Sequence, residues 1–243
     1  MKPLALLVLL LLLFSCSNRF PLHSAWDKKV YRKANTARFA FYLSRRSKES
    51  IRIVNLMRMN PGLFARTYYL DYLIVTGVLK SKEDTSKPYN GACRSLFREL
   101  TRLAPLPRLR PSFALHLSAS FHAICSGISG YEGHDYPVPF PVRALMFGTF
   151  NRSVGENCDY GTSDPMTAIM DLAIDEGVPG NGHRKNLLYK DFIRVGCSFK
   201  FHKKWDRNYV QDFSTGNLFE RMKRRRNEKK AIQSFYRKTL PKH

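Results

Sequence analysis

The segment GHRKNLL, residues 182–188, carries more information about the fold of this 243-residue chain than any other stretch. It places His183 and Arg184 directly after a glycine. Two short segments precede it, GHD at residues 133–135 and GEN at residues 155–157, and VQDF follows at residues 210–213. A match of three residues often occurs by chance. These four segments in this order are specific when they are taken together.

The order of these segments resembles the CAP superfamily, which comprises cysteine-rich secretory proteins, antigen 5 and pathogenesis-related proteins, and its bacterial members in particular. The resemblance extends from about Ile51 to Phe213. Further matching positions are the IVNxxRxNP segment at 53–61, PLPxL at 105–109, Leu117-x-Ala119, Arg143 and Gly148. The resemblance implies an α+β fold, a three-layer α–β–α sandwich with a central antiparallel sheet.

Local patterns favour the same fold class. Ser112 is a plausible N-cap for a helix, and Asp164-Pro165 combines a capping side chain with proline at the first helical position. The patterns of residues 195–201 and 209–213 indicate two strands joined by a basic turn, which predicts a closing hairpin. Helices followed by a hairpin are typical of an α+β or three-layer arrangement.

The resemblance also implies a site. The family displays two histidines and two acidic residues in a cleft, and the matching positions here are His134, Glu156, Asp175 and His183. Glu176, next to Asp175, is the alternative for the second acidic residue. We expect four neighbours to support the cleft: Asp135, Asn157, Arg184 and Asn186.

Two kinds of chemistry suit such a set. Imidazoles beside carboxylates form a metal site, in which each carboxylate orients a ring N–H, or an acid–base pair in which the carboxylate raises the pKa of the histidine. His134 and His183 are one ligand short of a usual catalytic zinc set, so a carboxylate or water would complete it. Zn²⁺ or another divalent cation is therefore the expected cofactor, if there is one. A polar network that only fixes loops would use the same residues.

Three functions follow from these possibilities. The first is an extracytoplasmic binding module for a small ligand, a lipid or a divalent metal, as the resemblance implies. The second is a metal-dependent hydrolase in which Glu156 acts as general base to a metal-bound water. The third is a structural envelope protein. A serine nucleophile is disfavoured because no G-x-S-x-G segment occurs.

The N-terminus predicts export. Lys2 precedes an apolar run over residues 4–14, which is too short to span a bilayer and reads as a secretory signal. Leu13-Phe14-Ser15-Cys16 resembles a bacterial lipobox, so we expect a lipid on Cys16 and a periplasmic or cell-surface lipoprotein; ordinary cleavage and secretion is the alternative. The expected organisation is a signal peptide over 1–15, a basic leader over 16–46, the CAP domain over 47–216 and a basic tail over 217–243.

The net charge of +22 is concentrated at the two ends. Residues 17–48 hold nine Lys/Arg and one acidic residue, and residues 221–243 hold ten and one. We expect these arms to meet anionic lipid headgroups or acidic envelope polymers, or to be solvated tails. Nucleic acid is not expected, because no recognition motif is visible. Besides Cys16, the four cysteines Cys93, Cys125, Cys158 and Cys197 leave three disulfide pairings open.

Overall fold

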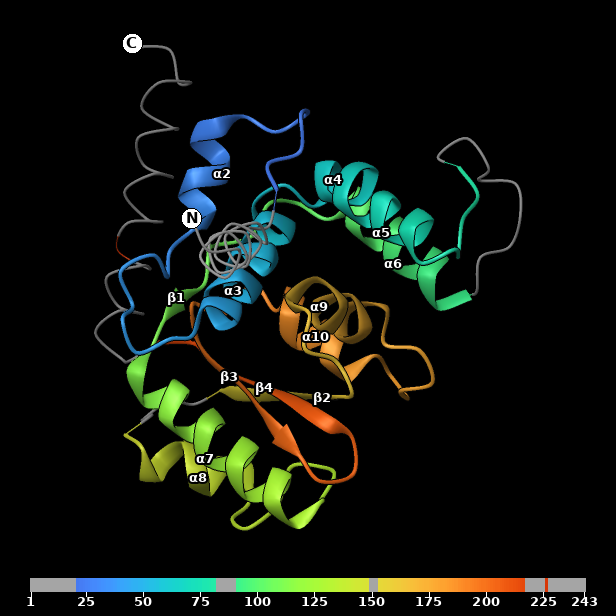
Figure 1. Cartoon of the computed structure of the whole chain (residues 1–243). Coiled ribbons are helices and arrows are strands. Elements are labelled where there is room, and N and C mark those ends of the chain that lie inside the picture. Colours follow the sequence, from blue (N-terminus) through green and yellow to red (C-terminus); the bar gives the residue numbers. More distant parts are fainter. Residues whose placement is uncertain (1–20, 82–90, 149–152, 217–225, 227–243) are drawn as a thin grey trace, which may run out of the picture.

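The computed structural model describes residues 21–81, 91–148, 153–216 and residue 226 (Figure 1). The predicted signal peptide, Cys16 and nearly all of the predicted tail therefore lie outside the described residues. Within the described ranges, no helix is both long and apolar enough to cross a membrane.

A four-stranded sheet forms the middle layer, in the order β1-β3-β4-β2. The strands are β1 (Arg110–Pro111), β2 (Val154–Tyr160), β3 (Arg194–His202) and β4 (Asp206–Ser214). The β3–β4 pair is the predicted closing hairpin. Strands β2, β4 and β3 are antiparallel, as expected, whereas the two-residue β1 adds to β3 in parallel.

One face of the sheet is covered by α7 (Phe113–Ser129) and the short α8 (Phe140–Met146) (Figure 1). Ser112 caps α7, because its hydroxyl accepts from the backbone N–H of Leu115, and Gly130 ends the helix in the left-handed conformation. Helix α7 lies so close to β3 that a Cβ at Gly196 would be 2.1 Å from the backbone nitrogen of His116. The missing side chain at Gly196 therefore sets the spacing between helix and sheet.

The opposite face carries the larger core and the remaining helices. They are α2 (Lys28–Ala34), α3 (Arg45–Met59), α4 (Pro61–Phe64), the π-helix η1 (Ala65–Tyr69), α5 (Leu70–Val75), α6 (Gly91–Arg102), α9 (Pro165–Ile174) and α10 (Gly182–Leu188). Asp164 caps α9 through the backbone N–H of Thr167, with Pro165 at the first helical position. Helices on both faces of the sheet confirm the predicted three-layer sandwich (Figure 1).

Buried Arg58 joins α3 to the end of α10 and to the segment that follows it. Its guanidinium donates to the backbone carbonyls of Pro107, Leu187, Tyr189 and Phe192 at 2.7–3.1 Å. Burial lowers its pKa to about 10, so the group stays charged at neutral pH. A cation that neutralises four carbonyl dipoles fixes where α10 ends.

Packed structure begins earlier than the predicted domain start at residue 47. The core on the α3 side includes five residues of the segment expected to be a leader: Trp26, Ala34, Ala37, Ala40 and Leu43. The Trp26 indole donates to the hydroxyl of Thr67 at 2.9 Å. At least residues 26–43 are therefore part of the folded unit. Cys125, Cys158 and Cys197 are free thiols, so no disulfide joins them.

Candidate functional site

The four tetrad residues, His134, Glu156, Asp175 and His183, form two histidine–carboxylate pairs. Nδ1 of His134 lies 2.9 Å from a carboxylate oxygen of Glu156, and Nδ1 of His183 lies 2.8 Å from one of Asp175. The two imidazole centroids are 6.5 Å apart. The side chains of His134 and His183 are 44% and 22% exposed, whereas both carboxylates are buried. The two imidazoles thus lie side by side at the surface, and each is hydrogen-bonded to a buried carboxylate.

The loop that carries His134 is fixed on both sides. The backbone N–H of Gly133 donates to the hydroxyl of Tyr160 on β2 at 2.9 Å. On the other side, Arg143 of α8 donates to the carbonyl of Val138 at 2.7 Å. These bonds hold the loop so that the His134 side chain contacts Glu156 on β2.

Glu156 lies on β2 between two buried groups. The buried guanidinium of Arg143 donates to the carboxylate oxygen that His134 does not use. Asp212 on β4 is the direct cross-strand partner of Glu156. Burial raises the pKa of Glu156 to about 7 even though Arg143 opposes the shift, and burial and Glu156 raise the pKa of Asp212 well above its ordinary value. Because Arg143 contacts Glu156 directly, Glu156 carries the charge and Asp212 keeps a proton.

Asp175 ends α9 in the left-handed conformation, with φ 56°. One oxygen of its carboxylate accepts from the backbone N–H groups of His183 and Arg184 at 2.9 and 3.1 Å, and the other accepts from the His183 ring. Glu176, the alternative acidic residue, is exposed. The structure therefore places Asp175, rather than Glu176, in the tetrad.

Two of the four expected support residues, Asn157 and Asn186, are hydrogen-bonded to the backbone of the tetrad residues. The side-chain amide of Asn186 donates to the Glu156 carbonyl at 3.1 Å and to the Asn157 side-chain oxygen at 2.8 Å, and Asn157 donates to the His183 carbonyl at 3.1 Å. A Cβ at Gly155 would lie 2.6 Å from the Asn186 side-chain oxygen, which explains the glycine before Glu156.

Arg184 and Asp135 act at a greater distance from the imidazoles. Buried Arg184 donates to the carbonyls of Ala173 and Ile174 at 2.6 and 2.5 Å, which ties α10 to the end of α9. Asp135 is exposed and acts on His134 through its charge. Burial lowers the pKa of His134, Asp135 opposes this and Arg143 adds to it. His134 is therefore a neutral imidazole at pH 7.

The donor set fits a soft or borderline divalent cation. Since each Nδ1–H points to a carboxylate, the lone pair of a neutral ring is on Nε2. In the described part of the chain, neither Nε2 makes a hydrogen bond. Two imidazoles that share a tetrahedral zinc at about 2.0–2.1 Å have ring centroids about 5 Å apart, so the rings must close by roughly 1.5 Å.

A second cluster lies deeper, where ligand atoms of His122, Glu156 and Cys158 fall within 4.8 Å of one another. Both ring nitrogens of His122 already face backbone carbonyls, those of Tyr136 and Gly133, at 2.7 and 2.8 Å. Burial raises the pKa of the Cys158 thiol well above its ordinary value, and Glu156 is held by Arg143. A metal needs a thiolate and a free imidazole nitrogen. This buried set offers neither and suits a structural role.

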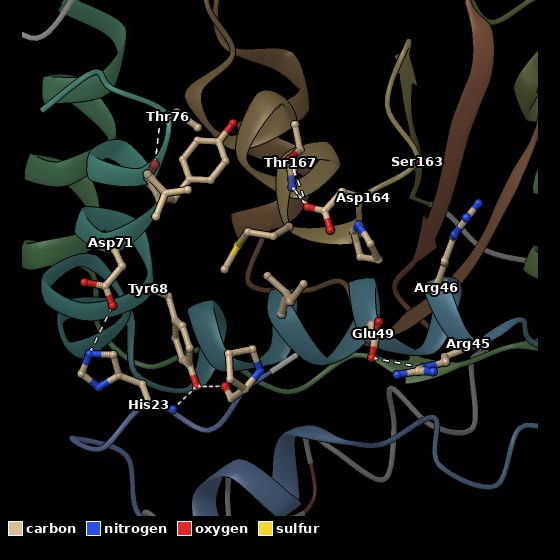
Figure 2. A pocket seen from close by; sticks show the side chains of 16 residues that line it. His23, Arg45, Arg46, Glu49, Tyr68, Asp71, Thr76, Ser163, Asp164 and Thr167 are labelled. Carbon is tan, nitrogen blue, oxygen red and sulfur yellow. Dashed lines mark hydrogen bonds and ion pairs between the residues drawn. The ribbon is translucent and has the colours of Figure 1, made fainter. Parts of the chain in front are cut away.

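A cavity lies elsewhere, between α3, the η1–α5 segment and the start of α9 (Figure 2). Its volume is about 930 Å³, and no tetrad residue lines it. Ile53, Tyr68 and Met166 contribute apolar surface, and the ion pairs His23–Asp71 and Arg45–Glu49 lie at its margin. This cavity, which has room for an organic molecule, is thus separate from the tetrad.

Sequence reasoning did not foresee the roles of two residues. Arg143 and Asp212 were noted only as matching positions, yet they flank Glu156 on its buried side. A signal was available for Arg143, which is a lone cation in the otherwise apolar segment FPVRALM. For Asp212, the available signal was an acidic residue next to Phe213 in a strand whose residues are largely buried.

The model of the CAP family, described as cysteine-rich secretory protein family, matches residues 51–213. An outer surface protein from Borrelia burgdorferi is 16% identical over 45% of this chain and 78% of its own, with a TM-score of 0.39. An extracellular protein containing a SCP domain from Bacillus anthracis is 26% identical over 45% and 34%, with a TM-score of 0.38.

A third solved structure covers more of the chain. Venom allergen-like protein 4 from Schistosoma mansoni is 14% identical over 72% of this chain and 91% of its own, with a TM-score of 0.42. The search of curated proteins gave no match.

Proposed function

Since the chain belongs to the CAP family of cysteine-rich secretory proteins, we propose that it is an exported member that binds a divalent cation between His134 and His183. One observation carries the proposal: two imidazoles lie 6.5 Å apart, and each is oriented at Nδ1 by a buried carboxylate. In metal sites, a carboxylate that accepts from one ring N–H of a histidine orients the other ring nitrogen toward the metal in the same way. Zinc, which favours neutral imidazole nitrogen, is the first cation to test.

The geometry favours binding over hydrolysis. A general base must reach a metal-bound water, but the Glu156 side chain is 1% exposed and its two oxygens face His134 and Arg143. Glu156 therefore orients the His134 ring and balances the charge of buried Arg143. Asp175 orients the His183 ring and accepts from two backbone N–H groups.

Membrane attachment is the second part of the proposal. The apolar run over residues 4–14 and the lipobox-like segment ending at Cys16 support export followed by lipidation. The basic arms over residues 17–48 and 221–243 would add attraction to anionic lipid or an acidic envelope polymer. Intact-mass analysis of the chain extracted from its native membrane tests this part directly, because acyl chains on Cys16 add a defined mass.

Metal affinity tests the first part. Isothermal titration of the purified chain with Zn²⁺ is expected to show one site, and His134→Ala and His183→Ala are each expected to weaken it by at least 10-fold. The matched control is His23→Ala, which removes a histidine that also faces a carboxylate, Asp71 at 3.3 Å, but lies outside the tetrad. Equal affinity in all three variants would refute a site at the tetrad.

A second candidate function is favoured by the cavity between α3 and α9. Its volume of about 930 Å³ and its apolar lining would accept a small apolar ligand (Figure 2). Filling the cavity with Ile53→Trp is expected to abolish co-purification of small organic molecules, as detected by mass spectrometry of a solvent extract. Zinc affinity should not change in that variant, because the tetrad lies elsewhere.

A further inference from the structure

The loop between α2 and α3 holds two phenylalanines outward. Ala37, Ala40 and Leu43 recur at intervals of three and are buried, which fixes the loop to the core. Between them, the side chains of Phe39 and Phe41 are 78% and 92% exposed. A loop with three buried anchors cannot turn these rings inward, so their exposure is built into the backbone.

The exposed rings continue into an aromatic patch, which we define as Phe39, Phe41, Tyr42 and Phe113. Phe41 contacts Tyr42 with ring centroids 5.8 Å apart, and Tyr42 contacts Phe113 at 5.0 Å. Phe113, the first residue of α7, is 55% exposed. The α2–α3 loop, β1 and the start of α7 lie together at one edge of the molecule (Figure 1). Contiguous exposed aromatic side chains of this kind mark an interaction surface.

The surroundings of the patch are cationic. The guanidinium of Arg38 lies 4.0 Å from the centre of the Phe39 ring. The charge of Arg194 opposes the rise that burial causes in the pKa of Tyr42, and the charge of Arg110 helps to lower the pKa of Arg194. Both arginines therefore lie near the patch. Residues 35–48 contain four Lys/Arg and no acidic residue. A partner of this surface must therefore be both apolar and anionic.

We propose that the aromatic patch is a membrane-docking face, in which Phe39 and Phe41 enter the interface of an anionic bilayer and the surrounding arginines bind lipid phosphates. Aromatic rings prefer the headgroup–acyl boundary, and each Lys or Arg near an anionic surface adds attraction. Two other occupants are less suited to it. A second copy of the chain, with net charge +22, and the basic segment 221–243 would both be repelled.

The docking face rests on the proposed membrane attachment. Pro21, where the described chain begins, lines the same cavity as Arg45 and Arg46, which directly follow Ser44 at the end of the loop (Figure 2). Cys16 precedes Pro21 by five residues, which span at most roughly 18 Å. A lipid on Cys16 would therefore hold this side of the molecule, rather than the opposite end, near the bilayer.

Tryptophan fluorescence on vesicles tests the docking face. Two variants of the full chain, Phe41→Trp and Phe201→Trp, are compared in a Trp205→Phe background, where the remaining Trp26 is buried. Phe201 is also exposed, but it lies near the other end of α7, where the backbone N–H of Lys203 donates to the Gly127 carbonyl, about 21 Å along the helix from Phe113. The vesicles contain brominated phosphatidylcholine with or without phosphatidylglycerol.

Emission from position 41 is expected to shift to the blue and to be quenched when phosphatidylglycerol is present, whereas emission from position 201 does neither. Equal quenching at both positions, or none at position 41 on vesicles that carry the protein, would overturn the docking face. A blue shift that depends on protein concentration without vesicles would assign the patch to a second copy and also overturn it. Intact-mass analysis separately tests whether Cys16 carries a lipid. Quenching at position 41 together with an unmodified Cys16 would therefore refute the lipid anchor but not the docking face.

Discussion

The carboxylate of Asp175 accepts three hydrogen bonds from a two-residue stretch that begins at His183. One oxygen takes the backbone N–H groups of His183 and Arg184, and the other takes the His183 ring at 2.8 Å. The end of α9 and the start of α10 are thus joined through the side chain that orients a tetrad imidazole. This coupling makes stability and the proposed metal binding depend on the same residue.

Asp175→Asn is expected to weaken zinc binding 10- to 100-fold with a modest loss of stability. Asparagine tolerates the left-handed conformation and still accepts hydrogen bonds through its amide oxygen, but it no longer holds the ring with a full charge. Asp175→Ala should also destabilise the fold by about 2–4 kcal/mol, because two backbone N–H groups lose their acceptor. Zinc titration and thermal unfolding measure the two effects.

The neighbouring Glu176→Gln is the matched control for Asp175, because Glu176 is exposed. It should change zinc affinity and melting temperature little. If Glu176→Gln weakened zinc binding as strongly as Asp175→Asn, the assignment of Asp175 to the tetrad would be wrong.

Arg143→Met is expected to destabilise the fold by about 3–5 kcal/mol, since it leaves the buried charge of Glu156 without its cation. Adding Glu156→Gln removes that charge and should restore part of the loss, and chemical unfolding of the single and double variants measures the coupling. Arg207→Met is the control, because Arg207 is 42% exposed in its pair with Asp206 and should contribute about 0.5 kcal/mol or less. Additive effects of Arg143→Met and Glu156→Gln would contradict the ion pair.

The raised pKa of buried Asp159 predicts that the stability of the fold depends on pH. Burial raises its pKa from 3.8 to about 7, and the charge of Asp171 adds to the shift. Between these pH values the folded chain holds a proton that the unfolded chain has released, so this contribution to the free energy of unfolding falls as pH rises to about 7. Asp159→Asn should therefore stabilise the fold by about 1–3 kcal/mol at pH 8 and hardly at all at pH 4. An equal effect at both pH values would exclude ionisation of Asp159 as the cause.

Gly196→Ala tests the contact between α7 and the sheet. The new methyl group would lie 2.1 Å from the His116 nitrogen, and neither backbone can move without separating the layers. A loss of about 3 kcal/mol or more, or failure to fold, is expected. Gly91→Ala is the control, because nothing lies within 4 Å of its Cβ and its φ is ordinary. Similar melting temperatures for the two variants would show that α7 is not held at this distance.

Much of the fold could be predicted because local signals agree with it. Ser112 and Asp164 cap the helices that they were expected to cap, and the alternation over residues 195–213 predicted the β3–β4 hairpin. The packing of residues 26–43 was missed, because nine basic residues within 17–48 obscure the buried positions between them. Neither could the π-helix η1 be predicted, since its register depends on packing around Tyr68 and Tyr69.

The members of the tetrad could be predicted from the family resemblance, but their pairing could not. That pairing depends on the direction in which Glu156 leaves β2 and on the left-handed turn at Asp175, both of which are set by tertiary structure. The ion pair between Arg143 and Glu156 could not be predicted either. A buried carboxylate requires a nearby cation, but the sequence does not say which of 41 Lys/Arg residues supplies it.

The most direct test of the central claim is X-ray absorption at the zinc edge on the zinc-loaded full chain. Binding between His134 and His183 predicts two imidazole ligands, with the remaining ligands oxygen, all at about 2.0–2.1 Å. A zinc–sulfur distance of about 2.3 Å would instead place the metal at the buried cluster with Cys158 and contradict the tetrad site. A protein that retains no zinc after equilibration would contradict it as well.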